Sequence, residues 1–92
     1  MHGIRLKGRL NIGASFDVAY RDGLLYAIQS GAYPRLNPLH NGRLVVADVS
    51  DPERPQVCAA LDGLGSARQI ELHGSVAYVT SREDGLFAVD LS

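Results

Sequence analysis

Histidine, cysteine and glycine are the residues of this sequence whose spacing would reveal a metal or nucleotide site. The histidines are His2, His40 and His73, and neither they nor Cys58 follow the close spacing of metal ligands. The glycines form no phosphate-binding pattern followed by a helix. We therefore expect no metal, no cofactor and no catalytic constellation, and this favours a non-enzymatic protein.

Two aspartates stand at matching places, where an apolar run ends and a turn begins. Asp48 is followed by Val-Ser, and Asp90 is followed by Leu-Ser. A carboxylate at such a position can accept hydrogen bonds from backbone N–H groups of the following turn. Recurrence at equivalent positions favours this structural role over catalysis or calcium binding. Cys58 falls inside an apolar run, where a small buried side chain is expected rather than a nucleophile.

Composition excludes several classes of partner. The chain has 92 residues, 46% of them hydrophobic, and a formal net charge of −1 with acidic and basic residues interspersed. No basic patch for nucleic acid is therefore expected. No apolar run approaches the ~20 residues of a membrane span, and the N-terminal residues lack the apolar core of a secretory signal. The compartment is left open.

Short strands are the elements that must position these residues. Four runs rich in β-branched, aromatic or aliphatic residues are separated by turn sequences, at 16–21, 24–29, 43–49 and 55–61. Asp22-Gly23 predicts a hairpin turn because both residues accept positive φ, and Pro52 and Pro55 bound a second turn. Apolar residues do not recur at helical spacing, so an all-β fold is expected.

The chain repeats itself in two registers. Val18 and Tyr26 match Ile70 and Tyr78, which lie 52 positions further on, whereas residues 44–50 match residues 86–92, 42 positions further on. The first copy therefore carries an inserted loop at 31–41. Without this loop the period is close to the length of a four-stranded propeller blade, about 40–45 residues.

These residues resemble a known family. Ala77-Tyr78-Val79, Gly85-Leu86 and the Asp-Val-Ser-Asp-Pro sequence at 48–52 are similar to the LVIVD repeat, a bacterial and archaeal propeller-type repeat, and the resemblance extends from about residue 14 to residue 92. Leu25-Tyr26-Ala27 matches it more loosely. The resemblance implies antiparallel four-stranded β-propeller blades, about two of them, and an exported or cell-surface setting for relatives. It implies no specific activity, because many members have no assigned biochemistry.

The repeat divides the chain into three parts. Residues 4–12 are expected to be an orphan outer strand, 13–62 a first blade-like repeat with the inserted loop 31–41, and 63–92 a second repeat that lacks its fourth strand. Propeller rings have typically 4–8 blades, so we expect this sequence to be part of a longer protein. The alternative is head-to-tail assembly of several copies, each donating its N-terminal strand to a neighbour.

A binding surface is expected where two loops of the first repeat emerge on the same side of a four-stranded meander. Loops on a rigid scaffold commonly carry binding function. The candidate residues on this rim are Tyr33, Arg35, Asn37, His40, Asp62 and Arg68. The competing interpretation is a tolerated insertion with solvated polar residues.

Two classes of function are consistent with these features. The first is a non-enzymatic propeller segment that acts as a scaffold for protein or surface interaction. The second is part of a propeller enzyme or metal- or ligand-binding protein with its site at the central channel. The inward candidates for that site are Asp17, Tyr20, Glu71 and His73. A stand-alone small β-barrel ignores the repeat and ranks last.

Overall fold

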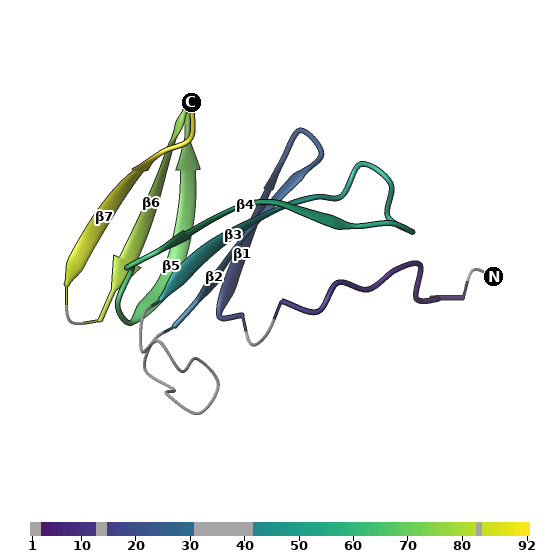
Figure 1. Cartoon of the computed structure of the whole chain (residues 1–92), viewed down its shortest axis with the longest axis horizontal. Helices are drawn as coiled ribbons and strands as arrows, with labels where there is room; N and C mark the ends of the chain where they lie inside the picture. Colours follow the sequence, from purple (N-terminus) through teal and green to yellow (C-terminus); the bar gives the residue numbers. More distant parts are fainter. Residues whose placement is uncertain (1–2, 13–14, 31–41, 83) are drawn as a thin grey trace.

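Two antiparallel sheets make up the computed structural model, which describes residues 3–12, 15–30, 42–82 and 84–92 (Figure 1). The first sheet, in the order β1-β2-β3-β4, contains Asp17–Arg21, Leu24–Gln29, Arg43–Asp48 and Gln56–Asp62. The second sheet, in the order β5-β6-β7, contains Ala67–His73, Val76–Ser81 and Gly85–Asp90. The described residues contain no helix, and therefore none that could cross a membrane. The expected all-β fold of partial propeller blades is confirmed.

The turns form where the sequence predicts them. Asp22 and Gly23 both have positive φ, 53° and 81°, which is the type I′ geometry that joins two strands through a two-residue loop. The second turn, after β3, is closed by Asp51. Its side chain accepts a hydrogen bond from the Glu53 N–H at 3.0 Å, and its carbonyl accepts one from the Arg54 N–H at 3.0 Å. Asp-Gly and Asp-Pro sequences thus build the connections between strands.

The strand register reproduces the internal repeat. Val18 pairs with Ala27 in the first sheet, and Ile70 pairs with Val79 in the second. On the next pair of strands, Tyr26 faces Val46 and Tyr78 faces Ala88. Val18 and Ile70 therefore occupy matching places in two separate sheets. The two copies in the sequence correspond to two copies of one β-meander.

The core lies between the two sheets, where β5 packs against β1 and β2. Side chains that alternate along β2 and β3 meet the side chains of β5 and β6. The cluster consists of Tyr26, Ile28, Leu44, Val46, Leu64, Ala67, Ile70, Ala77 and Val79. On β3 all of residues 44–47 are buried, including those on the face away from β5. A sheet covered on both faces explains why this run shows no alternation of apolar and polar residues.

Residues 3–12 do not form a strand, and the expected outer strand at 4–12 is therefore not formed in this structure. A fourth strand needs the third strand of its own blade as a partner, and the described residues offer none on that side of the first sheet. Residues 8–12 instead lie along the face of the first sheet opposite to β5–β7, near Leu25, Ala27 and Ala47 (Figure 1). The Gln29 side chain donates a hydrogen bond to the Ile12 carbonyl.

Cys58 is exposed, which corrects the expectation of a buried side chain. The ladder between β3 and β4 shifts at this point: Val46 pairs with Ala59 and Ala47 pairs with Val57, so Cys58 is the extra residue of a β-bulge. Its thiol donates a hydrogen bond of 3.4 Å to the Val46 carbonyl. All of β4 is exposed, because the second sheet has no fourth strand to lie opposite it.

Candidate binding surface

The rim predicted from the loops is only partly within the described residues. Tyr33, Arg35, Asn37 and His40 lie outside them. Asp62 ends β4, and its carboxylate lies 3.8 Å from Arg43 Nε at the start of β3. Arg68 lies on β5, and its guanidinium carbon lies 5.7 Å from the centre of the Phe16 ring, a cation–π contact. These two side chains therefore contact neighbouring parts of the fold. Their role in binding stays a prediction.

The ends of the loops meet on one side of the molecule, as expected for a meander. The Leu64 N–H, in the connection between β4 and β5, donates a hydrogen bond of 2.9 Å to the carbonyl of Gly42, at the end of the inserted loop. The Arg82 N–H, after β6, donates one of 3.1 Å to the Ser66 carbonyl. Three connections are thus held together at this rim.

Of the four inward candidates, the structure brings Asp17 and Glu71 together, in the lining of a hollow that Tyr78 and Leu86 share. Asp17 Oδ2 accepts a hydrogen bond of 3.0 Å from the Ile70 N–H and so joins β1 to β5. His73 Nε2 lies 3.6 Å from Glu71 Oε1, and the His73 ring packs edge-on against Tyr78 at 5.8 Å between centres. Tyr20 is exposed. In the part of the chain that the structure describes, no three His, Cys, Asp or Glu residues are grouped to hold a metal ion.

Loss of the Asp17 contact is expected to weaken the packing of the two sheets. Asp17→Ala removes the acceptor for the Ile70 N–H and should lower the free energy of unfolding by about 1.5–3 kcal/mol, as for other hydrogen bonds to a charged group. Asp17→Asn keeps an acceptor oxygen and should lose less. Urea denaturation of both variants measures the difference, and equal losses would contradict the role of this hydrogen bond.

Asp48 and Asp90 form the same turn in both repeats. Asp48 Oδ1 accepts a hydrogen bond of 2.6 Å from the Ser50 hydroxyl and one of 2.9 Å from the Ser50 N–H. Asp90 Oδ1 accepts equivalent bonds from Ser92, of 2.7 Å and 2.9 Å. The hydroxyl donors, followed by the backbone donors, lower the pKa of both carboxyls. The predicted structural role of these aspartates is therefore confirmed.

Acid is expected to destabilise both turns. Because the folded-state pKa of each carboxyl is lowered, their contribution to stability is complete above the ordinary aspartate pKa of about 4. It is lost as the pH falls through the lower folded-state values. The double variant Ser50→Ala/Ser92→Ala removes the main donors and should show a shallower loss of stability below that pH. Urea midpoints measured as a function of pH test this, and parallel curves would contradict it.

One face of the second sheet is exposed where its counterpart in the first sheet is buried. Tyr26 is 6% exposed and its equivalent Tyr78 is 38% exposed. Leu44 is 2% exposed, whereas Leu86, at the same position of the repeat, is 61% exposed. The face of β5–β7 that carries Tyr78 and Leu86, together with Gln69, Glu71, Thr80 and Ala88, is named the outer face. It has no covering layer in the described structure.

At the other end of the two stacked sheets the burial is reversed: the residue of the first repeat is exposed and its equivalent in the second repeat is buried. Ile70 is 8% exposed because it packs on the first sheet, and its equivalent Val18 is 51% exposed. Tyr20, the counterpart of the partly buried Leu72, is also exposed. The face of the first sheet that carries Val18 and Tyr20 is named the far face. Residues 8–12, together with Pro52 and Pro55, lie along part of it.

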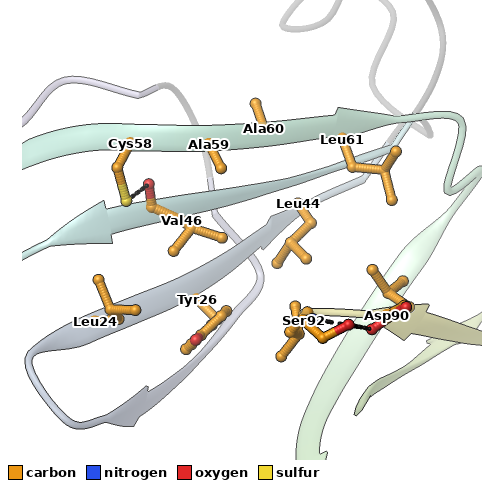
Figure 2. Close-up of a pocket in the computed structure, with 12 residues that line it drawn as sticks. Leu24, Tyr26, Leu44, Val46, Cys58, Ala59, Ala60, Leu61, Asp90 and Ser92 are labelled. Carbon is orange, nitrogen blue, oxygen red and sulfur yellow. Dashed lines mark hydrogen bonds between the residues drawn. The ribbon is translucent and has the colours of Figure 1, made fainter. Parts of the chain in front are cut away.

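A hollow of about 430 Å³ opens between β4 and the end of β7. In Figure 2, residues Cys58 to Leu61 of β4 lie along one side, Tyr26 and Leu44 lie at the base, and Asp90 and Ser92 lie on the other side. β7 is the edge strand of the second sheet. A fourth strand paired with β7 would occupy this hollow, opposite β4.

The family model for the LVIVD repeat matches residues 39–61 and 64–92, which is more than half of the chain. The chain belongs to the LVIVD-repeat family. The second LVIVD match covers all three strands of the second sheet, and the first contains β3 and most of β4. The resemblance inferred from the sequence is confirmed. No curated protein and no solved structure matches the chain.

The residues of the outer face of the last LVIVD repeat are not among the binding candidates that the sequence predicts. A signal for it exists in residues 86–89, Leu-Phe-Ala-Val, which are apolar on both faces of β7. In the first repeat the equivalent run on β3 is covered on both sides. An apolar run without alternation predicts a strand that is buried on both faces. Applied to the last repeat, this rule predicts a partner for its outer face.

Proposed function

We propose that this LVIVD-repeat chain is a non-enzymatic scaffold that binds protein through the surfaces of its sheets. The observation that carries the proposal is the exposure of Leu86 and Tyr78 at positions where the repeat buries Leu44 and Tyr26. Large exposed apolar side chains with polar neighbours, here Gln69 and Glu71, are typical of an interaction site on a folded protein. An open strand edge beside it offers backbone hydrogen bonds to the same partner.

The chemistry of the described side chains supports a scaffold rather than a catalyst. The inward candidate Asp17 is used in a hydrogen bond between sheets, and Asp48 and Asp90 are used in turns. Stoichiometric calcium, zinc or a transition metal in the purified protein would overturn the non-enzymatic assignment. Metal analysis by inductively coupled plasma mass spectrometry measures this directly.

Site-specific photo-cross-linking tests the binding surface. A photoreactive amino acid at position 86, on the outer face, should give discrete protein adducts in cells that produce the chain. The same residue at position 53, on the exposed turn after β3, is the matched control and should give none. Adducts of equal yield at both positions, or none at position 86, would contradict protein binding through the outer face.

The rim is tested separately. Shortening the inserted loop 31–41 to the length of the three-residue connection 82–84 of the second repeat should leave adducts at position 86 intact if the loop is a tolerated insertion. If the shortened chain loses its protein partner, the rim residues Tyr33, Arg35, Asn37 and His40 contribute to the same interaction.

A further inference from the structure

We infer that the outer face binds a second copy of this chain, docked head to tail, and that the second copy also supplies its residues 4–12 as the strand that pairs with β7. The inference rests on the proposed function and names its partner. In this arrangement the outer face of one copy packs on the far face of the next. Each contact uses two different surfaces of the chain, so the assembly is heterologous and can close into a ring.

The chain already contains a version of this contact. Within one copy, the face of the first sheet that carries Tyr26, Ile28 and Leu44 packs on the face of the second sheet that carries Ile70. The strand registers place Tyr78 and Leu86 at the positions of Tyr26 and Leu44. One copy therefore exposes counterparts of both halves of an interface that it forms internally, with Thr80 at the position of Ile28 and Glu71 at the position of Ala19.

The other half of the interface matches in the same way. Val18 stands at the position of Ile70, and Tyr20 stands at the position of Leu72. Both Val18 and Tyr20 are exposed apolar side chains on the far face. Packing this face on Tyr78 and Leu86 of a second copy would bury apolar surface on both partners, which drives association.

A polar contact can also be repeated across the new interface. Asp17 Oδ2 accepts a hydrogen bond from the Ile70 N–H where the two sheets of one copy meet. Gln69 stands at the position of Asp17 in the second sheet, and Val18 stands at the position of Ile70. The amide oxygen of Gln69 is therefore placed to accept a hydrogen bond from the Val18 N–H of the neighbouring copy.

Residues 4–12 have the pattern of a strand with one buried face. Apolar Ile4, Leu6, Leu10 and Ile12 alternate with polar Arg5, Lys7, Arg9 and Asn11. Strict alternation is typical of a half-buried β-strand. Ile4 is fully exposed and Leu6 is 84% exposed in a single copy, whereas Leu10 and Ile12 are half-buried, so the first half of the apolar face of this segment is uncovered.

The position of this segment is already that of a fourth strand. Residues 8–12 lie near Ala47 and Val49 on the far face. In the second repeat, Val89 and Leu91 stand at the positions of Ala47 and Val49, and they line the hollow opposite β4. Residues 8–12 therefore occupy the same position relative to the first sheet that β4 occupies relative to the second sheet. A copy whose outer face docks on the far face would bring its β7 edge alongside residues 4–12.

The size of the assembly follows from the blade count. Each copy provides two sheets, and propeller rings close with typically 4–8 blades, so a closed ring requires roughly two to four copies. Native mass spectrometry of purified residues 1–92 should therefore give a mass of two to four times 9.9 kDa. A chain that stays monomeric at high micromolar concentration would overturn the inference.

Complementary variants test the head-to-tail geometry. Leu86→Glu places a charge on the outer face, and Val18→Glu places one on the far face. Both side chains are exposed in a single copy, so each variant should keep the circular dichroism spectrum and the monomer unfolding midpoint of the parent chain. Each variant alone should be monomeric. An equimolar mixture should form a one-to-one dimer and no larger species, because one intact outer face meets one intact far face.

An isologous contact predicts a different result. If two outer faces bound each other, Val18→Glu alone would still dimerise. Mixing it with Leu86→Glu would then not increase the amount of dimer. That outcome would overturn the head-to-tail arrangement. Adducts from position 86 that contain only a different protein, with the chain itself monomeric, would also overturn it and leave the proposed scaffold function standing. If position 86 gives no protein adduct at all, both the head-to-tail arrangement and the proposed scaffold function are contradicted.

The strand donation has its own test. Leu6→Asp should weaken assembly by about tenfold or more, as for loss of a central apolar contact. Lys7→Asp, its neighbour on the polar face of the segment, is the matched control and should weaken assembly less. A second measurement uses Cys58, which lines the hollow beside β7. Its alkylation by iodoacetamide should slow on assembly. Equal rates in monomer and oligomer would overturn the donation of residues 4–12.

Discussion

Leu44→Ala is expected to lower the free energy of unfolding by about 2–5 kcal/mol, the range for truncating a buried leucine. The Leu44 side chain is 2% exposed and belongs to the core between the two sheets. Removing most of it takes away buried apolar surface and leaves a cavity that the surrounding strands fill only partly. Urea denaturation at low protein concentration, where the chain is a monomer, measures the loss.

Leu86→Ala is the matched control for this substitution. It changes the same residue type at the equivalent position of the second repeat, where the side chain is 61% exposed. The expected change in the free energy of unfolding of the monomer is within about 0.5 kcal/mol. A similar loss in both variants would show that the outer face is covered within one copy, in contradiction to the structure.

Gly42→Ala is expected to destabilise the chain by about 1–3 kcal/mol, the usual cost of overpacking a filled site. Gly42 lies where the inserted loop enters β3, and a Cβ there would overlap the carbonyl oxygens of Gly65 and Gln29. Both are backbone atoms, and the Gly42 carbonyl also accepts the Leu64 N–H at 2.9 Å. The backbone must shift where the two sheets are connected.

Gly3→Ala is the control for this prediction. A Cβ at Gly3 would meet no heavy atom within 4 Å, so no change in stability is expected. Thermal or urea unfolding of both variants gives the comparison. If Gly42→Ala were as stable as the parent chain, the close approach of the three backbone segments at this rim would be wrong.

Much of the fold is local and could be predicted. Asp22-Gly23 dictates a tight turn because the two residues tolerate positive φ, and β1 and β2 then pair in one register. The unbroken apolar run Leu44 to Ala47 is typical of a strand covered on both faces, and these four residues are buried. The repeat predicted two sheets with the same register, because equivalent side chains bury in equivalent ways.

The candidate site could be predicted far less well. Asp62 lies beside Arg43 and Arg68 lies over the Phe16 ring, and neither contact follows from spacing along the chain. The Cys58 side chain was expected to be buried but is exposed, because the second sheet has no fourth strand that would cover β4. Burial of a β-strand depends on what faces it, and a sequence pattern records only that some covering layer is required.

By itself, the sequence determined the strands, the turns, the repeat and the family, because φ preferences and apolar periodicity act over a few residues. The tertiary structure alone decided which of two equivalent leucines is covered and where residues 3–12 lie. The stacking of two sheets buries the faces between them, and residues 8–12 cover only part of the far face. The exposed outer and far faces are the physical consequence of that stacking.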